Sequence, residues 1–305
     1  MSAVGGDEER LARSFEEHRA HLRSVAYRML GSLAEAEDAV QETWLRLGRV
    51  DPAGIGNLGG WLTTVTGRIC LDLLRSRTAR REQPMDDTFV PDPVLRPLSR
   101  TDPEQEALEA DSVGIALLVV METLAPDERL AFVLHDMFAV PFDDIAPVVE
   151  RTPAATRQLA GRARRRVRDS APPSEPDAAR QRQALDAFRA AARTGDFEAL
   201  LAVLHPDVVL RADAGALVRG AAGSKRLRGA QRVAESAMLF ARYNATARMV
   251  LVNGAPGLVS VVDGHVGSVL AATVHEGRIT ALYILADPER LEGLVLPDEE
   301  DSRNA

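Results

Sequence analysis

The fold of the first half of the chain is decided by residues 142–168, FDDIAPVVERTPAATRQLAGRARRRVR. Apolar residues at helical spacing predict one short helix over residues 142–149 and a second over residues 153–167. Thr152 suits the N-cap of the second helix because its hydroxyl can accept a hydrogen bond from the first turn, and Pro153 suits the first position because proline has no N–H to leave unpaired. Two short helices joined by such a turn are typical of a helix-turn-helix.

The second of these helices has one apolar side and one basic side. Its apolar side is formed by Thr156, Ala160, Ala163 and Val167. Its outward side carries Arg157, Gln158, Gly161, Arg162 and Arg165. Arginine can bind guanine, and glutamine adenine, through two hydrogen bonds each, while glycine lets the helix approach a groove closely. We predict that this side contacts DNA bases; the alternative is a solvated basic helix in a bundle.

Helical periodicity also dominates the residues before this motif. Apolar stripes run over residues 22–30 and 36–47, and Gly31 between them suits a helix C-cap. The breaker-rich residues 51–60, DPAGIGNLGG, predict a loop, after which helical spacing resumes over residues 61–81. We therefore expect an all-helical first domain over residues 10–82.

Two proline-containing linkers divide the rest of the chain. Five prolines within residues 83–103 exclude a continuous helix, so we expect an extended linker over residues 83–111. The helix-turn-helix module then occupies residues 112–170, and a second linker occupies residues 171–177.

The last third of the chain changes to a strand pattern. A helix predicted over residues 178–192 is followed by alternating or β-branched runs, separated by turns such as Asp263-Gly264. These runs cover residues 208–210, 247–252, 257–262, 267–274 and 279–285. We expect an α+β domain with a curved antiparallel sheet over residues 178–293 and an acidic tail over residues 294–305. The predicted fold is thus two all-α modules followed by an α+β domain.

Composition excludes several classes of protein. The chain has 305 residues, of which 46% are hydrophobic and 27% charged, as in ordinary globular proteins. A single cysteine, Cys70, excludes an intramolecular disulfide framework and a cysteine-built zinc site. The N-terminus is acidic and polar, unlike a signal peptide, and no apolar run approaches the length of about 18 residues that a membrane span needs. We expect a cytoplasmic protein that does not enter a membrane.

The formal net charge of −8 hides two clusters of opposite sign. Residues 151–168 contain seven arginines and no acid, whereas residues 34–42 contain four acids and no base. Glu35, Asp38 and Glu42 share one helical face, but no histidine and no second carboxylate helix accompany them. We therefore expect no metal and no cofactor here, and a face that is either solvated or docked on another protein.

Two further stretches carry a family resemblance. Residues 35–47, EAEDAVQETWLRL, and residues 61–82, WLTTVTGRICLDLLRSRTARRE, resemble region 2 of the bacterial extracytoplasmic-function (ECF) sigma factors of RNA polymerase. Residues 112–168 resemble region 4 of the same family. The resemblance implies that the beta-prime clamp helices of core RNA polymerase bind Asp38, Gln41, Glu42 and Arg46. It implies promoter DNA contacts at the minus-ten element by Trp61, Arg68, Arg75 and Arg77, and at the minus-thirty-five element by the basic helix.

The last domain resembles the SnoaL-like (NTF2-like) domain of one ECF group, the SigJ-like group. Residues 89–93, FVPDP, resemble the linker signature WLPEP of this group, and residues 287–291, DPERL, resemble its signature NPDKL. Residues 213–217, DAGAL, depart from the related signature DGGGK. The resemblance implies that this domain regulates the sigma regions intramolecularly, through contacts made by Phe89, Pro91, Asp92, Pro93, Asp213, Asp287, Pro288 and Arg290.

SnoaL-like domains also include isomerases and hydrolases with a conical pocket, so the fold alone does not fix the function. Histidine and aspartate could provide acid–base chemistry, but His205 and Asp207 lie at a helix-to-strand junction and His275 at the start of a turn. We expect a regulatory module without catalysis. The alternatives are a pocket that senses a small-molecule ligand and a pocket that turns one over.

Overall fold

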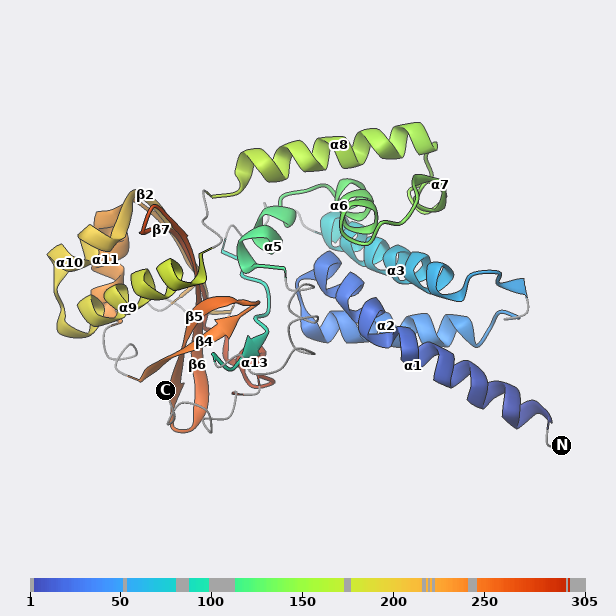
Figure 1. Ribbon diagram of the computed structural model, residues 1–305, viewed down its shortest axis with the longest axis horizontal. Coiled ribbons are helices and arrows are strands. Elements are labelled where there is room, and N and C mark those ends of the chain that lie inside the picture. The colour runs from blue at the N-terminus through green and yellow to red at the C-terminus, as the bar shows by residue number, and fades with distance from the viewer. Residues whose placement is uncertain are drawn as a thin grey trace. The chain divides into compact units, whose positions relative to one another are not determined.

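The structure is a computed structural model that describes residues 3–51, 54–80, 88–98, 113–172, 177–215, 218, 220, 223–240, 246–294 and 296 (Figure 1). The chain forms two compact units. Unit 1 consists of Met1–Gln83 and Met121–Ser170, and unit 2 of Pro84–Val120 and Ala171–Ala305. Arg81 and residues 297–305 of the predicted acidic tail lie outside the described residues.

The first helices of unit 1 follow the predicted stripes. They are α1 (Ala3–Leu30), α2 (Leu33–Leu47) and α3 (Leu58–Arg80). Gly31 has the left-handed φ of 71° that the predicted C-cap requires, and Ser32 then caps α2 by accepting a hydrogen bond from the Glu35 amide. The predicted loop over residues 51–60 was three residues too long. Its end is the first turn of α3, because the Asn57 side chain accepts a 3.0 Å hydrogen bond from the Gly60 amide.

The helix-turn-helix lies in the second part of unit 1. Its helices are α5 (Ile115–Met121), which ends in this unit, α6 (Pro126–Phe132), the π-helical turn η2 (Val133–Met137), α7 (Phe142–Ile145) and α8 (Pro153–Ser170). Thr152 caps α8 as predicted, since its Oγ1 accepts a hydrogen bond from the Ala155 amide at 3.2 Å. The helix predicted over residues 142–149 ends early, at Ile145, because Pro147 has no N–H with which to continue it.

A buried arginine joins the two halves of unit 1. The Arg129 side chain on α6 is 2% exposed and donates to a carboxylate oxygen of Glu122 at 2.5 Å. Its Nη2 and Nε also donate to the backbone carbonyl of Arg28 on α1, at 3.1 and 3.3 Å. Close packing accompanies this contact, since a Cβ on Gly67 of α3 would lie 3.1 Å from side-chain carbons of Leu130 and Leu134. The helices of the two sequence motifs therefore share one core.

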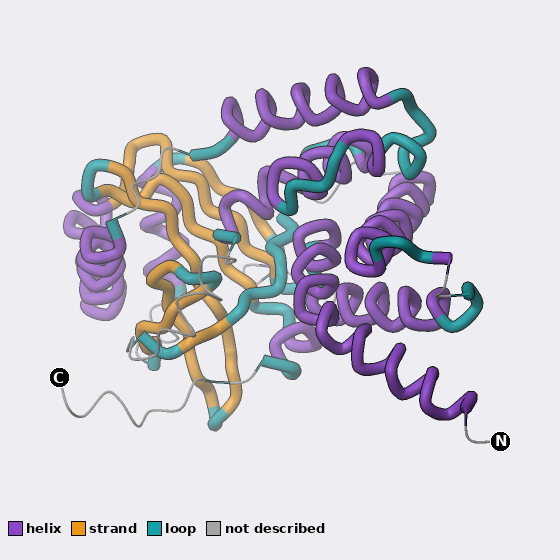
Figure 2. Tube along the Cα trace, turned by 45° about the vertical axis from the view of Figure 1, so that its right-hand side comes forward, coloured by secondary structure: helices purple, strands orange, loops and turns teal. Residues whose placement is uncertain are grey.

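Unit 2 is an α+β fold built on one seven-stranded sheet (Figure 2). The strands are β1 (Leu95–Arg96), β2 (Leu204–Asp213), β3 (Lys225–Arg228), β4 (Ala247–Val252), β5 (Ala255–Val262), β6 (His265–His275) and β7 (Arg278–Leu285). Their order is β1-β4-β5-β6-β7-β2-β3. All neighbours are antiparallel except β2 and β7, which run parallel, so the predicted antiparallel sheet is mixed at this one pair. The predicted fold class, two helical modules followed by an α+β domain, is confirmed.

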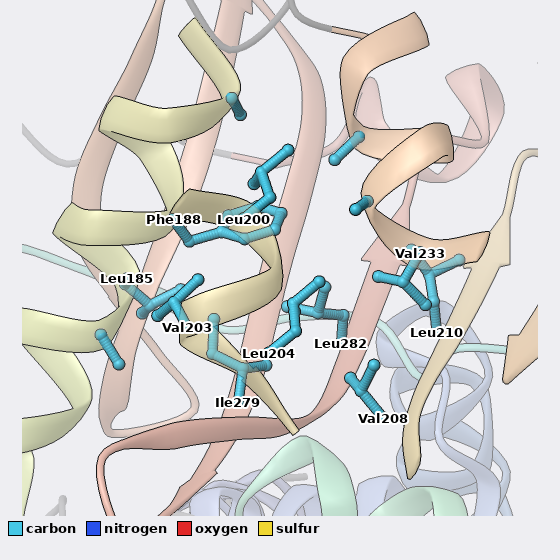
Figure 3. Packing of buried hydrophobic residues seen from close by; sticks show 14 of the residues in the cluster. Leu185, Phe188, Leu200, Val203, Leu204, Val208, Leu210, Val233, Ile279 and Leu282 are labelled. Carbon is cyan, nitrogen blue, oxygen red and sulfur yellow. The ribbon is translucent and has the colours of Figure 1, made fainter. Parts of the chain in front are cut away.

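Helices cover one face of this sheet and form the core of unit 2. They are α9 (Ala178–Thr194), α10 (Phe197–Val203) and α11 (Ala230–Leu239). Figure 3 shows Leu185, Phe188 and Leu200 of these helices packed against strand residues such as Leu210 and Leu282. A last short helix, α13 (Pro288–Leu291), follows β7. A helix pair, a curved sheet and a third helix give the architecture that the SnoaL-like (NTF2-like) resemblance implies.

Candidate functional site

The outward side of α8 carries most of the residues predicted to contact DNA bases. Arg157, Gln158 and Arg165 are exposed, and a Cβ on Gly161 would meet only the tip of the Arg165 side chain, at 3.9 Å. Thr156, Ala160 and Ala163 are fully buried on the opposite side. The surface that α8 presents is therefore basic, smooth at Gly161 and held by a small-residue core.

The flanks of α8 are tied to acidic residues of the neighbouring helices. Glu128 on α6 is 6% exposed, and it accepts hydrogen bonds from Arg162 Nε at 2.7 Å and from Arg166 Nη1 at 3.2 Å. Arg164 pairs with Asp136 at 2.5 Å on the other flank. Arg162, a predicted base contact, thus lies at the edge of the basic surface and already holds a buried carboxylate.

The predicted minus-ten residues on α3 differ in their surroundings. Arg68 is exposed, whereas Arg75 donates to Asp127 of α6 from Nη2 at 2.9 Å and from Nε at 3.1 Å. Arg77 pairs with Glu35 of α2. Trp61 is half-buried against the cluster that contains Leu22 and Leu62. Arg68 is therefore the member of this predicted set whose side chain is most accessible.

The acidic helix α2 presents a face with both polar and apolar residues. Asp38 and Gln41 are exposed, and Glu42 is paired with Arg46 at 2.9 Å. Leu45 lies on the same face and is 49% exposed, which sequence reasoning missed. The signal was present, since Leu45 follows Asp38 by seven residues and Gln41 by four, the spacing of one helical face.

In unit 2, the guanidinium of Arg290 binds two groups of the linker and one group at the end of β2. Its Nε donates to Asp92 at 2.7 Å, its Nη1 to Asp213 at 2.8 Å, and its Nη2 to the carbonyl of Val90 at 2.6 Å. The ring of Phe89 lies 5.0 Å from the guanidinium carbon, within the range of a cation–π contact. Three residues of the linker signature and Asp213 at the end of β2 therefore meet at this arginine of the C-terminal signature.

A second group of contacts is made by Asn253, in the turn between β4 and β5. Its Oδ1 accepts from the Val94 amide at 2.9 Å, and its Nδ2 donates to the carbonyl of Val113, also at 2.9 Å. Directly after Val94, β1 pairs with β4. We call the residues Val90, Asp92, Val94, Asp213, Asn253 and Arg290 the linker clasp. Asn253 was absent from the predicted set, although an Asn-Gly pair between two strands is a strong hairpin signal.

The remaining predicted regulatory residues surround the linker clasp. Pro91 and Pro93 are buried, Pro288 occupies the first turn of α13, and Asp287 caps that helix by accepting from the Glu289 amide at 3.0 Å. Gly215 has a φ of 76°, and a Cβ there would lie 2.7 Å from the carboxyl carbon of Asp287. Residues 213–217, DAGAL, therefore keep a glycine at the position where close packing against Asp287 requires one, although they differ from the signature DGGGK. Ala216 and Leu217 lie outside the described residues.

The titratable residues considered for catalysis do not converge on a pocket. Asp207 forms an exposed pair with Arg228 at 3.3 Å, and His275 faces Glu276 at the β6–β7 turn. In the part of the chain that the structure describes, no three His, Cys, Asp or Glu side chains come together as metal ligands would. No helix in those residues is long and apolar enough to cross a bilayer.

Sequence comparison places the two helical motifs in a known family. The model of Sigma-70 region 2 matches residues 14–80, and that of Sigma-70, region 4 matches residues 115–167. The chain is 39% identical over 300 residues to the ECF RNA polymerase sigma factor SigJ of Mycobacterium tuberculosis (strain ATCC 25618 / H37Rv), covering 93% of this chain and 94% of that protein. It is 36% identical over 280 residues to the probable ECF RNA polymerase sigma factor SigI of M. tuberculosis (strain CDC 1551 / Oshkosh), covering 91% and 93%.

A solved structure extends the similarity to the whole fold. The crystal structure of M. tuberculosis SigJ superimposes with a TM-score of 0.71 at 36% identity, over 92% of this chain and 97% of that one. Both helical motifs and the α+β domain lie within this coverage. Sigma factors are transcription factors and not enzymes, in agreement with the predicted lack of catalysis. The chain belongs to the ECF RNA polymerase sigma factors, of the SigJ-like type with a C-terminal NTF2-like domain, and it directs RNA polymerase to promoter DNA.

Proposed function

We propose that the C-terminal domain, residues 178–293, regulates this sigma factor intramolecularly by holding the linker between region 2 and region 4. The proposal keeps the predicted division of the chain, with the linker over residues 83–111. The observation that carries it is the double contact of Asn253, which brings Val94 and Val113 onto one side chain. Because one side chain holds both Val94 and Val113, the chain between these two residues adds nothing to the distance that the linker can span.

The contact of Asn253 with Val94 and Val113 greatly shortens the distance that the linker can span. The two matched sigma regions are separated by 34 residues, which can span roughly 115 Å when fully extended. With residues 95–112 closed off, about 16 residues remain, with a reach of roughly 55 Å. The names of the minus-ten and minus-thirty-five elements place them about 25 base pairs apart. This spacing corresponds to about 85 Å along B-DNA. Holding the linker therefore disfavours simultaneous binding of both elements, and release favours it.

Transcription in vitro with core RNA polymerase tests this regulation. Asn253→Gly removes the side chain but keeps the turn, because Asn253 has a φ of 50° that glycine adopts freely. The matched control is Asp263→Gly, in the next turn, where Asp263 has a φ of 51° and an exposed side chain. We expect Asn253→Gly to increase transcription from a promoter that needs both elements. Equal transcription by the two variants would overturn the proposal, and a decrease would contradict the reach argument.

The surfaces of unit 1 have roles of their own in this proposal. We propose that α2 docks on the beta-prime clamp helices through Asp38, Gln41, Glu42 and Arg46, with Leu45 as an apolar anchor. Leu45 supports this because an exposed leucine among charged residues is typical of an interface core with a polar rim. Leu45→Asp should weaken binding to core polymerase at least tenfold. Val50→Asp, at a residue that is 43% exposed beyond the end of α2, is the control that should bind normally.

We further propose that α3 contacts the minus-ten element through Trp61, Arg68, Arg75 and Arg77, and that the basic side of α8 contacts the minus-thirty-five element. The exposure of Arg68 and of Arg165 supports these assignments. Footprinting of holoenzymes that carry Arg68→Ala or Arg165→Ala tests them separately. Each variant should weaken protection at its own element, and equal weakening on promoters of different sequence would mark the side chain as a phosphate contact.

A further inference from the structure

The C-terminal domain encloses a cavity of about 250 Å³ between the sheet and helices α9 and α11. Its walls are mainly apolar, with Phe188, Leu258, Leu282 and Ile284 among the lining residues. The volume lies just below the range of about 300–1,000 Å³ that is common for small-molecule sites. The cavity is therefore suited to a compact, largely apolar ligand.

One basic side chain reaches this cavity. Lys225 is the only lysine of the chain, and it lies on β3. Along this strand Lys225 and Leu227 are partly buried while Arg226 and Arg228 are exposed, the alternation of a strand with one face inward. The ammonium nitrogen lies 4.5 Å from the ring centroid of Phe240, which also lines the cavity. Burial lowers the pKa of Lys225, so its positive charge is costly where it stands.

Hydroxyl groups supply the other polar atoms of the wall. Ser260 and Ser268, on neighbouring strands, lie with their Oγ atoms 2.7 Å apart, and Ser236 of α11 is also part of the lining. Among the described lining residues there is no histidine, aspartate or glutamate to act as an acid–base pair. The serine hydroxyls can bind and orient a polar head group.

We propose that this cavity binds a small amphipathic monocarboxylate, with its carboxylate at Lys225 and its apolar body against Phe188 and the sheet. One ammonium group balances one negative charge, which favours a monocarboxylate over a phosphate dianion. A bound carboxylate also offsets the cost of keeping Lys225 charged in a partly buried position. The serine hydroxyls can donate to a further polar oxygen of the ligand.

The cavity and the linker clasp share one strand end, which gives a bound ligand a route to regulation. Ala212 and Ala214 line the cavity, while Asp213 between them binds Arg290 on the other face of β2. Ala286 also lines the cavity, and its amide donates to the Asp213 carbonyl at 2.7 Å. A ligand that moves this strand end therefore changes the geometry of the clasp. This coupling, unlike the binding itself, rests on the proposed regulatory function.

Calorimetric titration of the full chain with octanoate tests the site, with octanol and octylamine as probes of the same apolar length. We expect octanoate to bind and the two other probes to bind at least tenfold more weakly. Lys225→Met, which keeps an apolar stem of similar length, should weaken octanoate binding at least tenfold. The matched control is Arg228→Met, at the exposed side of the same strand, which should leave binding unchanged.

Several results would overturn the proposal. They are the absence of octanoate binding, equal binding of octanol, and equal binding of octanoate by the wild type and by Lys225→Met. Lys225→Arg provides a check against misfolding, because it keeps the charge and should retain binding within severalfold. Hydrogen exchange at the Val90 amide with and without octanoate reports the coupling. If octanoate binds but this exchange is unchanged, the site stands and only its link to the clasp fails. Failure of the Asn253→Gly experiment would affect the regulation and not the binding.

Discussion

Arg129 of unit 1 and Arg290 of unit 2 each join a carboxylate to a backbone carbonyl far away in the sequence. Arg129 binds Glu122 and the carbonyl of Arg28, 101 residues before it, and its side chain is 2% exposed. Arg290 binds two carboxylates and the carbonyl of Val90, 200 residues before it, and its side chain is 21% exposed. Water can therefore reach and replace the partners of Arg290 far more easily. We therefore expect the Arg129 contact of unit 1 to stay closed in the native protein, and the Arg290 contact that holds the linker to open more readily.

Replacing the buried arginine of unit 1 should have the largest effect. Arg129→Met leaves Glu122 and the Arg28 carbonyl without this partner in a dry environment, so we expect a loss of about 3–5 kcal/mol in the free energy of unfolding of unit 1. Urea unfolding followed by tryptophan fluorescence measures it, because the two tryptophans of the chain, Trp44 and Trp61, both lie in unit 1. Arg168→Met, at a side chain that is 74% exposed, should change it by less than about 0.5 kcal/mol.

The corresponding change in unit 2 should be smaller. Arg290→Met leaves Asp92 and Asp213 without their common cation, but their surroundings admit water, so we expect a loss of roughly 2 kcal/mol at the clasp. The Val90 amide, which donates to Asp213 at 3.3 Å, should exchange with solvent about thirtyfold faster. Arg278→Met, at an exposed residue of β7, is the control. A loss as large as that of Arg129→Met would contradict the distinction between a lasting and an opening contact.

The exposed arginines of α8 allow a comparison on a single helix. Arg165→Ala should weaken binding of the holoenzyme to a minus-thirty-five duplex by about 1 kcal/mol or more, with little effect on stability. Arg162→Ala should instead lower the stability of unit 1 by roughly 1 kcal/mol, because it removes the nearer of two partners from buried Glu128. Fluorescence anisotropy and thermal unfolding measure the two effects. If both variants lose DNA binding but keep their stability, the contact between Arg162 and Glu128 does not stabilise unit 1.

The smallest effect concerns Cys70, which lies in the core that Arg129 helps to close. Burial raises the pKa of the Cys70 thiol to about 12, so at pH 8 almost no thiolate is present and the native protein should not react with thiol reagents. The folded state holds this proton more tightly than the unfolded state, so the Cys70 contribution to stability falls as the pH rises above about 9. Labelling in Arg129→Met should be measurably faster, and equal rates would show that the core does not depend on Arg129.

Elements with local signals could be predicted, and elements that depend on distant partners could not. The C-cap at Gly31, the N-cap at Thr152 and the strand over residues 247–252 follow from their own neighbourhoods, and the structure has them there. Strand β1 lies in a proline-rich linker and exists because β4 offers it a partner about 155 residues later. Short helices α10 and α11 were missed because seven to ten residues carry too little periodicity, although Asp196 is a recognisable N-cap for α10.

In the candidate sites, too, features with a local signal could be predicted and contacts between distant residues could not. The basic side of α8 and the acidic α2 could be identified from helical spacing, and the linker and C-terminal signatures from their resemblance to a family. The sequence alone could not indicate that Arg162 holds Glu128, that Arg75 holds Asp127, or that Asn253 binds Val94 in the linker and Val113 just after it. Each of these pairs joins residues at least 34 positions apart, so only the folded chain brings them together.

If Arg75 binds the minus-ten element as predicted, Asp127 of α6 and the DNA compete for its side chain. The Nε–H and one Nη2–H of Arg75 donate to Asp127, so these two N–H groups cannot at the same time bind a base or phosphate at the minus-ten element, where Arg75 is predicted to bind. To the extent that promoter DNA takes over these donors, promoter binding and the contact between Arg75 and Asp127 weaken each other by the same factor. Promoter binding would then require this ion pair to open, and neutralising Asp127 would remove that cost for every promoter alike.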